Sequence, residues 1–201
     1  MKKTIAIISV VVLALLVAAT VILAVIPKNF YDPIKNHDQI SFIRVFKGDG
    51  TCQEFYRNSV DETDKEVYDK LIELHEKSLK ENILVSMFQG ALSFDGSIKT
   101  EAFTSDTFND QLATSTYIEF NYTEEQLLKY NEKTFYNGDG ETVTYRKMVL
   151  EVTSSGYMEE VKAFVSESDY STKHNVRFLA HQSELYKYIQ SLDLLGTVAT
   201  A

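Results

Sequence analysis

Hydrophobic and polar positions divide the chain into one long apolar block followed by many short alternating segments. The block covers residues 4–26 and holds 15 Ile, Val or Leu and 5 Ala, with no charged residue. As a helix with a rise of about 1.5 Å per residue it would measure roughly 34 Å, enough to cross a hydrocarbon core of about 30 Å. A lone strand could not satisfy its backbone in lipid, so the block is predicted to be a transmembrane helix.

The ends of this block predict its limits and its orientation. Lys2 and Lys3 precede it, Thr4 begins it, and Ile26 ends it before Pro27, which cannot continue a helix. Positive charge collects on the cytoplasmic side of membrane helices. We therefore expect a cytoplasmic N-terminus, with the rest of the chain outside the cell membrane.

A cleaved signal peptide is the alternative for the same block. Signal peptides have an apolar region of about 7–15 residues that ends at a small-x-small site. Residues 17–19, Val-Ala-Ala, could serve as such a site. Cleavage there would leave the apolar residues 21–26 exposed at a new N-terminus, so the uncleaved signal anchor is the preferred interpretation.

After a short polar linker over residues 27–38, the chain has the pattern of a β-hairpin. Gln39–Phe46 is rich in Ile, Val and Phe at both alternating sets of positions, which is typical of a central strand. Residues 48–50, Gly-Asp-Gly, form a turn signal. Thr51–Tyr56 is then expected to return beside the first strand.

The clearest amphipathic helix begins near Thr63. Thr63 and Glu66 have the spacing of a capping box, and basic residues follow in the last turn. His75 lies between acidic neighbours on this helix and is expected at its surface or boundary. The apolar stripe of the helix consists of Val67, Leu71 and Leu74.

The remaining segments predict a sheet with helices attached to it. A capping-box pattern suggests a short helix over Thr123–Tyr130, and a last helix is expected from Ser183 to about Gly196. Strands joined by turns, with helices far apart in the sequence, indicate an α+β domain over residues 39–196. This domain should contain a mostly antiparallel sheet and two or three amphipathic helices, and residues 197–201 should form a tail after it. The other expected strands are Ile83–Phe94, Ile98–Thr104, Tyr117–Tyr122, Thr142–Val152, Glu160–Val165 and Asn175–Ala180.

Charge and cysteine content restrict the partners of this domain. Without Lys2 and Lys3, 18 basic residues stand against 29 acidic ones, a formal charge of −11. Such a charge argues against nucleic acid and against anionic lipid or wall polymers as partners. Cys52 is the only cysteine, so no disulfide can form within the chain, and we interpret it as a small, buried or half-buried side chain.

Motifs for catalysis, metals or cofactors are not found. The four histidines are His37, His75, His174 and His181, and none has a metal-ligand spacing. There is no G-x-S-x-G elbow and no Gly-rich phosphate loop. Residues 137–140, Asn-Gly-Asp-Gly, fit a hairpin turn better than a calcium loop. No catalytic, cofactor or metal residue is therefore predicted.

Three functions remain open for a membrane-anchored domain of this composition. The leading hypothesis is an extracytoplasmic binding or accessory domain of unknown ligand, which could be a partner protein, an envelope component or a small molecule. The alternatives are a hydrolase that uses acidic groups with His174 or His181, and an assembly subunit that associates through its anchor. Tyr117 and Tyr145 are more readily explained by cross-strand packing than by an outward ligand-stacking surface.

Overall fold

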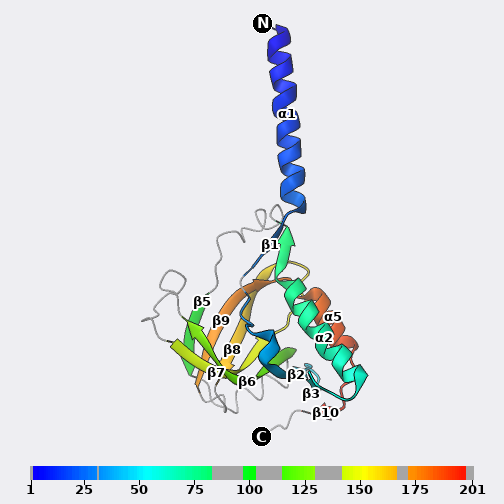
Figure 1. Ribbon diagram of the computed structural model, residues 1–201, viewed down its shortest axis with the longest axis vertical. Coiled ribbons are helices and arrows are strands. Elements are labelled where there is room, and N and C mark those ends of the chain that lie inside the picture. The colour runs from blue at the N-terminus through cyan, green and yellow to red at the C-terminus, as the bar shows by residue number, and fades with distance from the viewer. Residues whose placement is uncertain are drawn as a thin grey trace.

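The computed structural model has the α+β architecture that the sequence predicts. Its described part contains three α-helices and one large antiparallel sheet, from which the first helix projects as a stalk (Figure 1). The structure describes residues 2–30, 32–82, 97–102, 115–129, 142–166 and 172–197.

The stalk is helix α1, Lys2–Val25, which confirms the helix predicted over residues 4–26. Lys2, Lys3 and Thr4 lie in its first turn, Ile26 follows its last residue, and Pro27 opens strand β1. The segment Ile7–Val25 is long and apolar enough to cross a membrane, and none of it is buried against the domain.

The large sheet has eight strands, and every neighbouring pair is antiparallel. Their order across the sheet is β10-β3-β2-β6-β7-β8-β9-β5. A second, two-stranded sheet pairs β1, Pro27–Asn29, with β4, Lys80–Asn82. The strands of the large sheet are β2 Ile40–Phe46, β3 Thr51–Tyr56, β5 Ser97–Ala102, β6 Tyr117–Lys129, β7 Thr142–Glu151, β8 Glu159–Ser166, β9 Thr172–Ala180 and β10 Gly196–Thr197.

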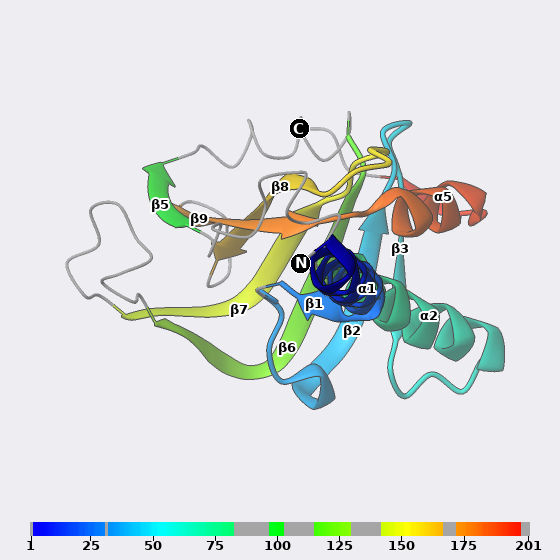
Figure 2. The same cartoon turned by 90° about the horizontal axis from the view of Figure 1, so that it is seen from above.

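The main core lies between one face of this sheet and two helices, α2 (Glu62–Ser78) and α5 (Ser183–Ser191). These helices lie next to each other in the view along α1 (Figure 2). Alternate residues of the central strands point into this core, such as Ile43, Phe120 and Met148, all with no exposed surface. The other sheet face carries a smaller cluster of Phe46, Tyr117, Val149 and Phe164.

The predicted N-terminal cap of α2 and the predicted C-terminal end of α5 are both wrong in detail. Helix α2 is capped by Asp61, whose side chain accepts a hydrogen bond from the Thr63 backbone N–H at 2.8 Å, so the capping box at Thr63 does not form. Helix α5 ends at Ser191 instead of near Gly196. The Lys47 ammonium donates to the carbonyls of Gln190 and Leu192 and satisfies the helix end.

The short helix expected over Thr123–Tyr130 is also wrong, because β6 continues as a strand to Lys129. The register of β6 with β7 shifts between Asn121 and Gln126, and pairing then resumes along the second half of the strand. The Gln126 side chain is buried and bonds to the side chains of Asn36 and Gln39. These tertiary contacts outweigh a local capping pattern.

Several expected segments lie wholly or partly outside the described residues. They are Ile83–Phe94, the turn at 137–140 and the tail after Thr197. The strand expected over Ile98–Thr104 is present as β5, and among the described residues it pairs with β9 at the sheet edge. The strands expected at Thr142–Val152, Glu160–Val165 and Asn175–Ala180 correspond to β7, β8 and β9.

The polar linker over residues 27–38 lies against the domain for much of its length. Phe30 and Ile34 are 7% and 1% exposed, and Ile34 belongs to the main core. The backbone N–H of Phe30 donates to the carbonyl of Leu79 at 2.8 Å, just after α2 ends. Residues His37–Gln39 then form the short 3₁₀ helix η1, which leads directly into β2.

Candidate functional site

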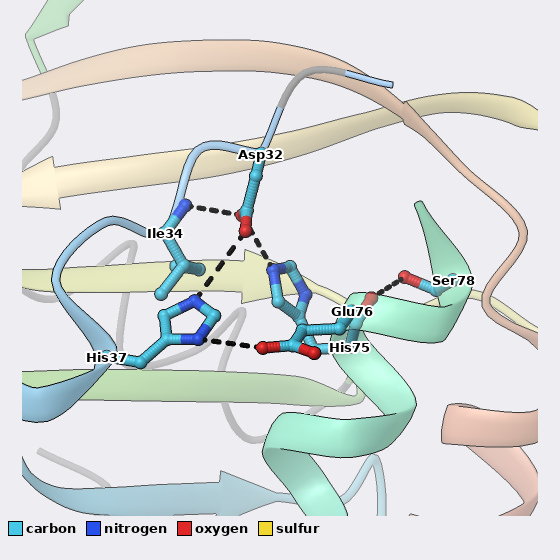
Figure 3. Close-up of polar contacts among 6 residues, drawn as sticks. All are labelled: Asp32, Ile34, His37, His75, Glu76 and Ser78. Atoms are coloured by element: carbon cyan, nitrogen blue, oxygen red, sulfur yellow. Dashed lines mark hydrogen bonds and ion pairs between the residues drawn. The ribbon is translucent and has the colours of Figure 1, made fainter. Parts of the chain in front are cut away.

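An acid–imidazole cluster joins the linker to the last turns of α2. We call Asp32, His37, His75 and Glu76 the Asp–His clamp (Figure 3). Asp32 lies between β1 and η1, His37 is the first residue of η1, and His75 and Glu76 lie on α2. The clamp therefore connects residues that are about forty positions apart in the chain.

Asp32 is the centre of the clamp. Its Oδ1 accepts a hydrogen bond from the Ile34 backbone N–H at 2.8 Å and lies 2.9 Å from His75 Nε2. The first contact is an Asx turn, which aspartate favours before a proline such as Pro33. Its Oδ2 lies 3.6 Å from His37 Nε2, at ion-pair distance. The loop geometry thus directs the carboxylate toward both imidazoles.

His75 is the buried end of the clamp. It has no exposed surface, and its ring lies 5.6 Å from that of Phe120, centroid to centroid. This corrects the expectation of a surface or boundary histidine. The contact with Asp32 favours the Nε2–H tautomer. Within the described part of the chain, His75 Nδ1 then has no hydrogen-bond partner.

His37 and Glu76 form the exposed end. His37 Nδ1 lies 3.1 Å from Glu76 Oε1, and the Glu76 side chain is 47% exposed. Acidic and imidazole groups thus alternate from solvent to the core in the order Glu76, His37, Asp32, His75. Because His75 has no exposed surface, only the end of this series formed by Glu76 and His37 is open to solvent.

The contacts within the clamp shift the pKa values of Asp32 and His37 in opposite directions. Burial acts to raise the pKa of Asp32, but contacts with His37 and His75 outweigh it, so this pKa lies far below its ordinary range. The Asp32 carboxylate raises the pKa of His37, against the opposing effect of burial. A charged Asp32 and a protonated His37 therefore stabilise each other.

A second group of chemically useful side chains lies where β4 meets the start of α5. His181 Nε2 lies 3.2 Å from Ser183 Oγ, and His181 Nδ1 lies 3.9 Å from a carboxylate oxygen of Glu81. The His181 backbone N–H donates to the carbonyl of Ser78 at 2.8 Å, which fixes this group beside the end of α2. His174 is placed elsewhere, in β9 opposite Thr100.

The sheet face opposite the helices holds a third polar group. Arg44 bonds to Glu54 and lies 3.6 Å from Glu119, which has no exposed surface and accepts a hydrogen bond from Asn121 at 2.8 Å. Cys52 is half-buried near this group, and burial raises the pKa of its thiol. Because a thiolate is the reactive form of cysteine, this environment does not favour a nucleophilic role.

The tyrosines considered as a possible outward surface are buried instead. Tyr117 and Tyr145 are 4% and 1% exposed, and the Tyr145 ring makes an edge contact with Tyr122 at 5.7 Å. This geometry fits the cross-strand packing that the sequence favoured. Among the described residues, no group of three or more His, Cys, Asp or Glu side chains is placed to hold a metal ion.

Sequence reasoning missed the clamp, although one signal for it was present. Leu71, Leu74, His75 and Ser78 recur at spacings of three and four, which places His75 on the buried stripe of α2. The partner of His75 is a loop aspartate whose position only the tertiary fold reveals. The chain matches no protein-family model, and neither curated proteins nor solved structures match it significantly.

Proposed function

We propose that the protein is a single-pass membrane-anchored domain that binds a partner outside the cytoplasm. The observation that carries this proposal is the docked linker. Phe30 and Ile34 are buried and the Asp–His clamp fastens their loop to α2, so the domain is held directly at the end of the stalk. A fixed position beside a membrane suits a domain that presents a surface to a neighbouring component.

The uncharged, apolar stalk and the two lysines at its start support this arrangement. The hydrocarbon core accepts α1 as a spanning helix, and the positive-inside rule places Lys2 and Lys3 in the cytoplasm. The acidic domain would then lie on the outer side. Its charge favours a neutral or basic partner surface over anionic polymers.

Within the described part of the chain, a hollow beside the start of α2 is a candidate surface for such a partner. Its volume is about 540 Å³, and its lining mixes apolar and polar side chains. Val60 is fully exposed, and Tyr56 is 46% exposed. The lining residues are Asp38, Ile40, Ser41, Tyr56, Arg57, Asn58, Ser59, Val60 and Thr123.

Crosslinking in native membranes tests this surface. The full-length chain and a Val60→Asp variant are expressed at equal levels, treated with a short crosslinker and purified under denaturing conditions. We expect a discrete crosslinked species for the wild type and its loss in Val60→Asp, because a buried charge disrupts an apolar contact. Leu195→Ser is the matched control, since Leu195 is 85% exposed but lies away from the hollow.

Two results would contradict the proposal. One is a crosslinking pattern that is the same in the wild type and in Val60→Asp. The other is release of the wild-type protein from membranes by alkaline carbonate, since a spanning helix resists that treatment whereas a processed, soluble domain does not.

A further inference from the structure

We propose that Glu81, His181 and Ser183 form a hydrolytic site for carboxylic esters, separate from the partner-binding hollow. The three side chains come from three places in the fold: β4, the residue after β9, and the first residue of α5. A hydroxyl within hydrogen-bond reach of an imidazole, with a carboxylate on the other ring nitrogen, is the arrangement that activates a serine nucleophile.

The distances assign a role to each group. Ser183 Oγ lies 3.2 Å from His181 Nε2, so the imidazole can accept the hydroxyl proton as a general base. His181 Nδ1 and the Glu81 carboxylate are 3.9 Å apart, which is an ion-pair distance. As positive charge develops on the imidazole, a small rotation of Glu81 closes this gap to a hydrogen bond. Glu81 is therefore a positioning residue.

The start of α5 supplies donors for the charge that develops on the substrate. The first intrahelical bond runs from the Tyr186 N–H to the Gln182 carbonyl, and among the residues that the structure describes no side chain caps this end. The backbone N–H groups of the first turn therefore point out of the helix beside the Ser183 hydroxyl. Such groups stabilise the oxyanion of a tetrahedral intermediate.

The reaction balances without any co-reactant other than water. Ser183 Oγ forms a bond to the ester carbonyl carbon while its proton passes to His181 Nε2. The carbon–oxygen bond to the alcohol then breaks, and the Nε2 proton goes to the leaving oxygen. Water attacks the resulting acyl-serine, gives a proton to Nε2, and releases the carboxylic acid as the proton returns to Ser183.

The position of the site in the fold indicates which kind of molecule carries the substrate ester. Glu81 lies in β4, which pairs with β1 immediately after the α1 stalk. Figure 1 shows β1, the pairing partner of β4, at the end of the domain from which α1 projects. The His181 and Glu81 side chains are 33% and 18% exposed, so they are accessible from this end. The substrate is thus an ester at the membrane surface, on a lipid or on an acylated envelope polymer.

Two measurements on the full-length protein in detergent test the site. A fluorophosphonate probe should label Ser183, located by peptide mass spectrometry, and p-nitrophenyl butyrate should be hydrolysed. Ser183→Ala and His181→Gln should each lower turnover by about 100-fold or more. Ser191→Ala is the control, because its hydroxyl lies at the other end of α5 and donates to the Tyr188 carbonyl.

The Glu81→Gln variant tests whether Glu81 orients His181 for the reaction or only stabilises the fold. It should lower kcat with little change in KM, because the imidazole loses the carboxylate that orients it. A merely structural role would lower the amount of folded enzyme and leave the kcat of the folded fraction unchanged. Comparison of phospholipid vesicles with a soluble acetylated glycan then distinguishes the two sources of ester.

The inference is overturned if folded wild-type protein is not labelled at Ser183, or if turnover persists in Ser183→Ala. It is independent of the partner-binding proposal, since Glu81, His181 and Ser183 do not line the hollow. Loss of crosslinking in Val60→Asp with no labelling of Ser183 would refute the hydrolytic site alone.

Discussion

Replacing Asp32 by asparagine tests the Asp–His clamp directly. The wild-type carboxylate contacts the Ile34 N–H at 2.8 Å, His75 Nε2 at 2.9 Å and His37 Nε2 at 3.6 Å. The amide retains one acceptor oxygen but has no charge. A hydrogen bond to a charged group contributes about 1.5–3 kcal/mol, whereas a partly exposed ion pair contributes about 0–1 kcal/mol. We therefore expect Asp32→Asn to lower the free energy of unfolding by about 2 kcal/mol.

The assay must report both global stability and local docking of the linker. The chain has no Trp and 12 Tyr, so near-ultraviolet circular dichroism of tyrosine can follow urea unfolding of the full-length protein in detergent. A loss of this size corresponds to a fall in Tm of about 4–8 °C for a domain of this length. Hydrogen exchange should accelerate at the Phe30 amide, which is bonded to the Leu79 carbonyl.

Asp38→Asn provides the matched control, since Asp38 lies in the same linker and is exposed. It should change stability by less than about 0.5 kcal/mol. If Asp32→Asn matches this control in unfolding free energy, and the Phe30 amide keeps its protection, the clamp does not hold the linker and the reasoning is wrong.

Two further predictions concern pH and the sheet edge. His37→Gln should lower the free energy of unfolding by about 0.5–1 kcal/mol at pH 5, and this difference should fade as the pH rises. The raised pKa of His37 stabilises the fold fully below about pH 6.5, and the contribution is lost as the pH rises through the pKa of the folded state. A constant difference from pH 5 to 9 would exclude this origin. The lowered pKa of Asp32 adds a contribution present above about pH 4, so the clamp is strongest between about pH 4 and 6.5. Gly196→Ala should lower Tm and expose β10 to proteolysis, because its Cβ would lie 2.5 Å from the Cys52 carbonyl oxygen. Gly156→Ala, which has open space around it, should leave both measurements unchanged.

Local patterns in the sequence predicted most of the sheet, but not how distant segments meet. Tyr117–Tyr122 alternates clearly, and Gln39–Phe46 is apolar on both faces because the main core covers one face of β2 and the smaller cluster with Phe46 lies on the other. Its expected central position is confirmed, since β2 lies between β3 and β6. The capping pattern at Thr123 wrongly predicted a helix, because strand β6 continues through a register shift at this point. Pairing with β7 stabilises the extended conformation of β6. Periodicity contains no information about such non-local pairing.

The candidate sites were less predictable than the fold. The sequence hypothesis named His181 as a possible hydrolase residue, and Ser183 lies only two positions after it. The contact with Glu81 becomes visible only once β4 is placed beside the start of α5. The clamp likewise depends on contacts between a loop and a helix that are distant in sequence. The prediction of the apolar stalk needed no such contacts, because the solvent alone determines the composition of a spanning helix.

The pairing of β10 with β3 determines when the sheet can finish folding during synthesis of the chain. Gly196 and Thr197 pair with Cys52 and Thr51, which come much earlier in the chain. This edge of the sheet therefore cannot form until the segment that holds β10 has left the ribosome. Contacts of such long sequence separation also slow folding. The nascent chain thus remains incompletely folded until β10 has been made, and chaperones have time to engage it before β10 pairs with β3.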